Sequence, residues 1–525
     1  MRRAAPGLPP VRRAVTIRRQ DVVVIGSGFA GSILAAALQK QGREVLLLER
    51  GSHPRFAIGE STTPLSNLLL EEIADEFDLP DLRALSKWGT WQKERPELAG
   101  GIKRGFTFYH HELGRAFPRR RGESLKRQLL VGASPNEWVA DTHWYRPDLD
   151  ACLVALAVRA GVAYRDRTDI EAVRENARGL RLSARRNGRR FEIAANFVVD
   201  ASGPRGCLHR ALKLPEGNAG GFPATQAVFG HFRGVKPLDA GFVPGEPPYP
   251  PEQAAVHHVF DGGWVWVLKF NQGVTSAGIV ATREAARRIG LCEGEAGWRR
   301  ALDALPALAE TFAEAKPVAP LFSLNQVAFQ SGRIRGRNWA LLPSAAGVVD
   351  PLLSTGFPLT LLGVQRLARA LGREKGAGLQ RELARYARST EQEFETTASL
   401  IRALYRAMGR FDDFKALTLL YFAAAGYSET ARRLGKASLA PDFLLRGHPT
   451  FGPRLRSLCR ARLTGRRLQA KVREAIAPID VLGLSASPLA SWYPASLDEL
   501  YRNAGKMGAT SAEVAAMVGR CLAPA

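Results

Sequence analysis

The sequence predicts an α/β fold: a Rossmann-type dinucleotide-binding domain with a β-rich domain inserted into it and a helical C-terminal module. Three observations lead to this prediction. Residues 21–50 alternate strand, glycine turn, helix and strand, and residues 221–325 hold short apolar runs separated by glycine and proline. Beyond about residue 385, apolar residues recur at helical spacing. With 525 residues, the chain is long enough for two or three domains.

The glycine turn comes directly after the apolar run at residues 22–25 and reads Gly26-x-Gly28-x-x-Gly31. Gly26 permits the tight turn from strand to helix, Gly28 lets the backbone approach a pyrophosphate, and Gly31 allows close packing of helix on strand. The N–H groups at the start of the helix bind phosphate oxygens. A second apolar strand ends in Glu49, at the spacing at which a carboxylate accepts hydrogen bonds from a ribose. Together these features predict a bound adenine dinucleotide.

The remaining segments suggest how the chain is divided. A helix is expected near residues 148–160, two short strands follow, and residues 197–203 read as a strand that ends in an acid and a glycine turn. Residues 91–140 are loop-rich, with turns expected at Gly100-Gly101 and at residues 118–122. We expect a basic disordered tail at 1–19, a discontinuous dinucleotide-binding domain at 20–90, 141–215 and 326–385, a β-rich domain at 91–140 and 216–325, and a helical module at 386–525.

The composition narrows the class of protein. The five cysteines are scattered without a C-x-x-C pair, which argues against a metal cluster or a disulfide framework and fits a reducing cytoplasm. No segment is long and apolar enough to suggest a membrane span. The net charge of +24 is concentrated near residues 115–127 and 454–473. Neither cluster is interleaved with stacking aromatics, so we expect a solvated surface or an acidic partner rather than nucleic acid.

Several segments, in order, resemble the flavin-dependent halogenases, within the larger group of p-hydroxybenzoate-hydroxylase-like oxidoreductases. After the glycine motif they are residues 54–61 (PRFAIGES), 87–90 (KWGT), 144–150 with Arg146, 200–203 (DASG), 264–266 (WVW) and 350–356 (DPLLSTG). The resemblance spans about residues 20–370.

The resemblance implies FAD as the cofactor, supplied in reduced form by a separate flavin reductase. It also implies a small aromatic or carrier-protein-bound substrate. The implied FAD contacts are Gly26, Gly28, Phe29, Ala30, Gly31, Glu49, Ser61, Arg146, Ile170, Asp200, Gly203 and Ser344.

In such enzymes, oxygen and reduced FAD oxidise halide to hypohalous acid, which is relayed to a lysine beside the substrate. By motif position that lysine is Lys87, whose amine can hydrogen-bond hypohalous acid; the alternative is a surface lysine that solvates a loop. Trp264 and Trp266 face the same side of a strand and are implied to keep the substrate from the flavin, although they would equally fill a core. Backbone N–H groups at Thr355 and Gly356 are the implied halide site, where simple helix capping is the alternative.

Three positions depart from the family pattern. Leu268-Lys269 stands where the family has Ile-Pro, and lysine lets the strand continue where proline would end pairing. Pro343-Ser344 replaces the usual Gly-Asp, so Ser344 offers FAD a neutral hydrogen bond. Leu353 replaces the glutamate of tryptophan halogenases, which makes free tryptophan a less favoured substrate than a phenolic, pyrrolic or carrier-bound one.

We therefore expect a cytoplasmic FAD-dependent oxidoreductase of the halogenase type. The first alternative is a monooxygenase or reductase on the same fold, which Leu268-Lys269 favours, and the second is a flavoprotein-derived scaffold without chemistry. The pairs His110-His111 and His257-His258 lack the partners that metal spacing requires. We therefore expect no metal site and interpret both pairs as polar loop residues.

Overall fold

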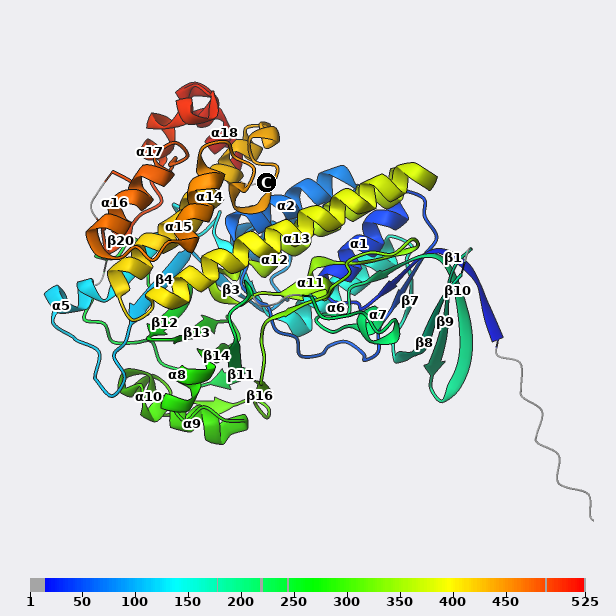
Figure 1. Ribbon diagram of the computed structural model, residues 1–525, viewed down its shortest axis with the longest axis horizontal. Helices are drawn as coiled ribbons and strands as arrows, with labels where there is room; N and C mark the ends of the chain where they lie inside the picture. Colours follow the sequence, from blue (N-terminus) through cyan, green and yellow to red (C-terminus); the bar gives the residue numbers. More distant parts are fainter. Residues whose placement is uncertain (1–14, 177, 218–220, 243–244, 487–488, 524–525) are drawn as a thin grey trace, which may run out of the picture.

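The computed structural model describes residues 15–176, 178–217, 221–242, 245–486 and 489–523. Within these residues, two large sheets lie apart from each other and long helices run along them (Figure 1). The predicted fold class is confirmed: a Rossmann-type α/β domain, a second sheet and a helical C-terminal region are all present.

In the described part of the chain the first sheet has seven strands in the order β7-β2-β1-β10-β9-β8, with β18 beside β10. They are β1 (Val15–Ile25), β2 (Val45–Leu48), β7 (Ala163–Arg165), β8 (Thr168–Asn176), β9 (Gly179–Arg186), β10 (Arg189–Asp200) and β18 (Trp339–Leu341). The strands β7, β2, β1, β10 and β18 run parallel. A parallel sheet needs helices on its faces, and residues 22–25 of β1 are accordingly apolar and buried, with α1 (Phe29–Lys40) following them. Helices α6 (Arg146–Arg159) and α12 (Gly356–Arg373) pack against α1.

The second sheet has nine strands among the described residues, in the order β15-β11-β14-β13-β12-β4-β5-β20 with β16 beside β11. They are β4 (Gly105–His110), β5 (Gln128–Gly132), β11 (Thr225–Arg233), β12 (Ala255–Phe260), β13 (Gly263–Lys269), β14 (Thr275–Thr282), β15 (Lys316–Pro317), β16 (Phe322–Leu324) and β20 (Trp492–Tyr493). Two short ladders pair β3 (Gly100–Lys103) with β6 (Asp141–Trp144) and β17 (Phe329–Gln330) with β19 (Gly347–Val348).

The two faces of the nine-stranded sheet enter different cores because side chains alternate along a strand. Val265 and Val267 pack with Trp298 in one core, beneath α8 (Arg283–Arg288), α9 (Gly294–Asp303) and α10 (Pro306–Thr311). Trp264 and Trp266 face the other way, into the large core shared with the Rossmann domain and the C-terminal helices.

The long helix α13 (Gly376–Ala407) contacts both sheets, and the long helix α14 (Phe411–Arg433) packs against α13 (Figure 1). Near its start α13 binds the Rossmann sheet, because Tyr386 donates a hydrogen bond of 2.6 Å to the carbonyl of Leu341 on β18. Near its end the same helix binds the second sheet, through Tyr405 and Trp264.

The remaining helices are shorter. They are α2 (Pro64–Glu76), α3 (Pro80–Arg83), α4 (Trp88–Glu94), α5 (Arg121–Lys126), α7 (Cys207–Ala211), α11 (Pro343–Ala346), α15 (Phe451–Arg460), α16 (Gly465–Ile476), α17 (Leu497–Arg502) and α18 (Ser511–Leu522). No helix in the described segments combines the length and the apolar character that a membrane span requires.

Several local expectations were wrong. The first fourteen residues of the expected tail lie outside the described residues, but 15–19 belong to β1, because they pair with β10. Gly100-Gly101 lies in β3 rather than a turn, since β6 pairs with it. The last helical region begins with α13 at Gly376, before residue 386, and it includes a short strand, β20, that joins β5.

Candidate active site

The carboxyl ends of four parallel strands bring the predicted cofactor residues to one edge of the Rossmann sheet. Ile25 lies in register with Leu48 on one side and with Asp200 on the other, and Asp200 lies in register with Leu341. The residues that follow these strand ends therefore share the edge: the glycine turn, Glu49, the turn at 200–203, and Ser344. Ligands of open α/β sheets bind at such an edge.

Close approaches explain the glycines of the first turn. Gly26 has φ +100°, and a Cβ there would lie 2.7 Å from the carbonyl carbon of Ala201. A Cβ on Gly31 would lie 1.9 Å from the carbonyl oxygen of Gly26. Gly28 is the N-cap of α1, and it has no side chain with which to satisfy the helix N–H groups. These N–H groups remain available to an anion.

Two arginines surround Gly28. A Cβ on Gly28 would lie 3.4 Å from Nη2 of Arg146 and 3.8 Å from Nη2 of Arg55. Arg146 is buried and is fixed by Asp150, whose two carboxylate oxygens each accept a hydrogen bond of 2.8 Å. A helix N-terminus, a residue without a Cβ and two guanidinium groups together fit a pyrophosphate.

Glu49 is buried at the end of β2. Its Oε2 accepts hydrogen bonds of 3.1 Å from the N–H and the hydroxyl of Ser27 and of 3.2 Å from Arg55, and its Oε1 accepts one from Gly51. Burial opposes ionisation, but the Gly51 N–H, the charge of Arg55 and the Ser27 donors outweigh it, so the pKa of Glu49 lies below its ordinary value. Glu49 is therefore a carboxylate acceptor at neutral pH.

Polar atoms near this edge still lack a partner. The buried atoms His53 Nδ1, Arg55 Nε and Tyr164 Oη make no hydrogen bond to any residue that the structure describes. His53 and Tyr164 both lie beside Ser27 and Glu49. Buried polar groups are normally satisfied, so these atoms fit a site that is completed by a polar ligand.

The other predicted cofactor residues lie around the same edge. Phe29 and Ala30 are buried in the first turn of α1, and Gly203 has φ +88° in the turn after β10. Asp200 uses its carboxylate within its own turn, accepting hydrogen bonds from Ser202 and from the Leu208 N–H.

Three more predicted cofactor residues are Ile170, Ser344 and Ser61. Ile170 and Ser344 are half-buried, and Ser61 is hydrogen-bonded to a lysine. Ile170 lies two residues beyond Thr168, whose N–H donates to the Glu49 carbonyl, and Ser344 lies in α11 just after β18. The hydroxyl of Ser61 accepts a hydrogen bond of 3.0 Å from Lys103.

Trp264 and Trp266 lie on one face of β13 with ring centroids 5.8 Å apart. Trp264 donates a hydrogen bond of 3.0 Å to the Tyr405 hydroxyl, and Tyr405 donates one of 2.9 Å to Asp350 Oδ2. Asp350 begins the segment that contains the predicted halide site. The structure thus joins the tryptophan pair to that segment through buried hydrogen bonds.

The segment at 353–356 has an unusual backbone. Leu353 and Ser354 have φ of +66° and +55°, a region that costs non-glycine residues on the order of 1–2 kcal/mol each. Thr355 is the N-cap of α12 but makes no side-chain capping bond, so simple capping does not account for it. A Cβ on Gly356 would meet nothing within 4 Å, so open space lies beside the first turn of α12. This leaves the helix N-terminus accessible to a small anion.

Lys87 precedes α4 in a half-buried position. Its Nζ lies 3.5 Å from Glu71 Oε1 and donates to the Cys521 carbonyl at 3.3 Å, and 15% of the side chain is exposed. Burial opposes ionisation of Glu71, but Arg433 and Lys87 outweigh it and hold its pKa below the ordinary value. A Cβ on Gly89 would lie 2.3 Å from the Trp138 ring, which explains the glycine of this motif.

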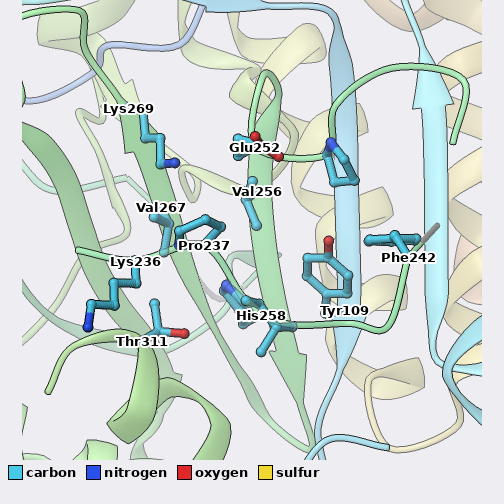
Figure 2. Close-up of a pocket in the computed structure, with 12 residues that line it drawn as sticks. Tyr109, Lys236, Pro237, Phe242, Glu252, Val256, His258, Val267, Lys269 and Thr311 are labelled. Atoms are coloured by element: carbon cyan, nitrogen blue, oxygen red, sulfur yellow. The ribbon is translucent and has the colours of Figure 1, made fainter. Parts of the chain in front are cut away.

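A cleft lies elsewhere, lined by residues of the second sheet (Figure 2). Its lining includes Tyr109, His258 and Lys269. Val256 and Val267 in its lining face the core opposite to that of Trp264 and Trp266. The prediction of polar loop histidines was wrong: His257 and His258 lie within β12 and are buried, and His111 is buried directly after β4. His111 Nε2 and His258 Nδ1 are 3.0 Å apart. Burial lowers the pKa of His111 to about 3, so its ring is neutral.

Sequence reasoning missed several of the groups that build the site. Arg55 was within a quoted motif but had no assigned role, although it contacts Glu49 and approaches Gly28. Asp150 four residues after Arg146 is a helical i,i+4 ion pair and was a detectable signal. Tyr405 lies far along the chain from Trp264 and Asp350, and no sequence signal indicated its contact with them.

Two protein-family models match this chain. Residues 21–235 match the FAD binding domain model and residues 141–415 match the tryptophan halogenase model. FAD is therefore the dinucleotide cofactor of this chain.

The chain is 29% identical to monodechloroaminopyrrolnitrin halogenase PrnC of Pseudomonas fluorescens, over 67% of this chain and 61% of that protein. It is 31% identical to tetracycline 7-halogenase of Kitasatospora aureofaciens, over 65% of this chain and 61% of that one. The matched region thus spans about three fifths of the length of these curated relatives.

Among solved structures, halogenase PltM in complex with phloroglucinol and FAD is similar in fold, with a TM-score of 0.72, 24% identity and coverage of 94% of this chain and 96% of that one. The family model alone covers more than half of the sequence, from the strand that carries Asp141 to the helix that carries Lys415. The chain belongs to the tryptophan halogenase family.

Proposed function

We propose that this chain is a flavin-dependent halogenase that acts on an electron-rich aromatic substrate, either free or bound to a carrier protein. The observation that carries the proposal is the placement of Lys87, a half-buried amine beside the ionised Glu71 in the Lys-Trp-Gly-Thr motif. The two curated relatives that are 29% and 31% identical to this chain are both named halogenases. Phloroglucinol, which accompanies FAD in the similar PltM structure, is an electron-rich phenol.

Reduced FAD, when bound, would supply with oxygen the oxidising equivalent that converts halide into hypohalous acid. The protein's part is binding and positioning. The N-terminus of α1, Arg55 and Arg146 would hold the pyrophosphate, and Glu49 would accept from a ribose hydroxyl. Thr355 and Gly356 would hold the halide at the N-terminus of α12.

Trp264 and Trp266 would keep the organic substrate away from the flavin. Their rings fill the face of β13 toward the shared core, and hydrogen bonds to Tyr405 and Ser276 fix both indole N–H groups. Lys87 would then bind hypohalous acid, and its ammonium would polarise the oxidant toward the substrate. Glu71 Oε1 lies 3.5 Å from that amine.

We also propose that a separate flavin reductase supplies the reduced cofactor and that the protein acts in the cytoplasm. The five cysteines are all free thiols in described segments, which fits a reducing compartment.

One observation favours a second candidate, an FAD-dependent monooxygenase that acts directly on its substrate. Strand β13 continues through Lys269, as predicted for the position where the family has proline. The same experiment separates the two functions. The FAD-loaded protein is reduced without oxygen and then mixed with oxygen, with and without bromide or chloride.

A halogenase yields hypohalous acid, captured by monochlorodimedone, only when halide is present. If the rate of flavin reoxidation does not depend on halide and the trap stays unreacted, the halogenase function is rejected in favour of the monooxygenase. A protein that binds no FAD at all would instead support a scaffold without chemistry.

A further inference from the structure

A second lysine, Lys103, lies fully inside the protein. It ends β3 in register with Asp141 of β6. Its Nζ donates to the Ser61 hydroxyl at 3.0 Å and to the Thr62 carbonyl, and it lies 3.8 Å from the centre of the Phe106 ring. Lys103 and Asp141 do not form a direct ion pair with each other. Two buried ionisable groups rarely stabilise a fold better than apolar residues would, so the presence of Lys103 and Asp141 needs another explanation.

Burial acts on both partners in the same sense. It lowers the pKa of Lys103 and raises the pKa of Asp141, each against the opposing charge of the other. Neutral forms of both groups are thus favoured more than on a surface. A neutral carboxyl group donates a hydrogen bond, and Lys103 is a donor in its charged form.

Several buried polar atoms around Lys103 and Asp141 have no hydrogen-bond partner among the described residues. Asn67 donates to Asp141 Oδ1 at 2.7 Å, but Asp141 Oδ2, Asn67 Oδ1 and His143 Nδ1 are buried without a partner among the described residues. Each such atom destabilises the folded protein unless a small molecule satisfies it. The set combines donors and acceptors, so it suits a small neutral molecule that both donates and accepts.

The position of the pair links two parts of the proposed site. On one side, Ser61 follows the loop whose carbonyls at Ile58 and Gly59 accept hydrogen bonds from Arg146. On the other side, Asn67 lies one helical turn before Glu71 on α2, and Glu71 contacts Lys87. Lys103 therefore lies between the cofactor edge and the predicted catalytic lysine.

Resting on the proposed function, we propose that Lys103, Asp141 and Asn67 form a binding station for hypohalous acid between the flavin and Lys87. Hypohalous acid has one O–H donor and acceptor lone pairs, and it is small and neutral, as the site requires. Lys103 holds the oxidant in its ammonium form, which donates a hydrogen bond and has no lone pair to attack the halogen, so no covalent bond forms or breaks at this station.

The test compares Lys103→Met with the double variant Lys103→Met/Asp141→Leu. Lys103→Met removes the positive charge near the buried Asp141 carboxyl group, so the urea midpoint of the FAD-free protein should fall. The double variant replaces the pair with apolar residues of similar size, so it should recover the midpoint. Lys415→Met is the matched control, because Lys415 is also buried but lies in α14 and pairs with Asp412.

Each FAD-loaded protein is then reduced and given oxygen and bromide in a single turnover, and hypobromous acid that leaves the protein is counted with monochlorodimedone. The double variant should reoxidise its flavin at the wild-type rate but release at least tenfold less trapped oxidant. Release at the wild-type level by the double variant would overturn the station. Absence of trapped oxidant from the wild type would instead overturn the proposed halogenase function, which separates the two failures.

Discussion

The Tyr405 hydroxyl donates a hydrogen bond of 2.9 Å to Asp350 Oδ2 inside the protein. The same hydroxyl accepts one from Trp264, so a tyrosine near the end of α13 connects the strand of the tryptophan pair to the segment before α12. No function could be assigned to helix α13 from the sequence. In the structure it fixes the relative position of two groups on which the proposed chemistry depends.

Tyr405→Phe should destabilise the protein by about 1–3 kcal/mol, because it leaves the buried Trp264 N–H without its acceptor and leaves Asp350 Oδ2 with only the longer hydrogen bond from Thr225. Urea unfolding measures the change. Tyr421→Phe is the matched control: Tyr421 is equally buried, on α14, and its hydroxyl makes no hydrogen bond among the described residues. Equal losses in the two variants would contradict the role given to the Tyr405 hydroxyl.

Asp350 should make stability depend on acid pH. Burial raises its pKa from 3.8 to about 6, against the hydrogen bonds from Leu352 and Tyr405. The folded protein therefore keeps a proton that the unfolded chain has released, and the free energy of unfolding falls as the pH rises from about 4 to about 6.

Asp350→Asn removes this titration. The difference in unfolding free energy between wild type and Asp350→Asn should therefore shift by up to about 3 kcal/mol over that pH range, since one unit of pKa corresponds to about 1.4 kcal/mol. A difference that stays constant from pH 4 to pH 6 would show that Asp350 has an ordinary pKa.

Lys87→Met should abolish transfer to the substrate while leaving formation of the oxidant intact. We expect the halogenated product to fall by at least about 100-fold, the range seen when a group that handles the reacting atoms is removed. Hypohalous acid captured by the trap should remain at the wild-type level.

Lys126→Met, on the exposed end of α5, is the control for loss of a positive charge. The product is measured by mass spectrometry with an electron-rich phenol that the wild type halogenates. Full activity of Lys87→Met would return this residue to the role of a surface lysine.

The cofactor edge was largely predictable from sequence because its signals are local. The glycine turn, the following helix and Glu49 lie within thirty residues, and strand, turn and helix all follow from the order of residue types. Parallel pairing then brings distant segments such as 200–203 to the same edge as a consequence of the fold class. These segments predicted an adenine dinucleotide, whereas its identity as FAD came from the resemblance to flavin-dependent halogenases and is confirmed by the FAD binding domain match at residues 21–235.

Contacts between distant segments were not predictable. Lys103 and Asp141 become neighbours only through the pairing of β3 with β6, and Gly100-Gly101 at the start of that ladder has the composition of a turn. The prediction that the histidine pairs lie in loops was wrong for the same reason. A His-His pair has no local feature that distinguishes a loop from the interior of a sheet. Pairing partners, rather than propensity, decided both outcomes.

Gly28→Ala should separate cofactor binding from folding. Gly28 has φ −67° and ψ 176°, which alanine adopts readily, so the FAD-free protein should unfold within about 1 kcal/mol of wild type. The added methyl group would instead lie 3.4 Å from Arg146 and 3.8 Å from Arg55, in the space where the pyrophosphate is expected. FAD affinity should fall by at least about 100-fold, because loss of close backbone approach removes several charge-assisted hydrogen bonds.

Titration of FAD absorbance and fluorescence measures the affinity of the Gly28→Ala protein, and urea unfolding checks the fold. Gly122→Ala is the matched control, since a Cβ on Gly122 meets nothing within 4 Å and this residue lies in α5. The control should bind FAD as the wild type does. Wild-type affinity in Gly28→Ala would place the pyrophosphate away from the N-terminus of α1, and Arg55 and Arg146 would then serve only to fix Glu49 and the loop at 58–59.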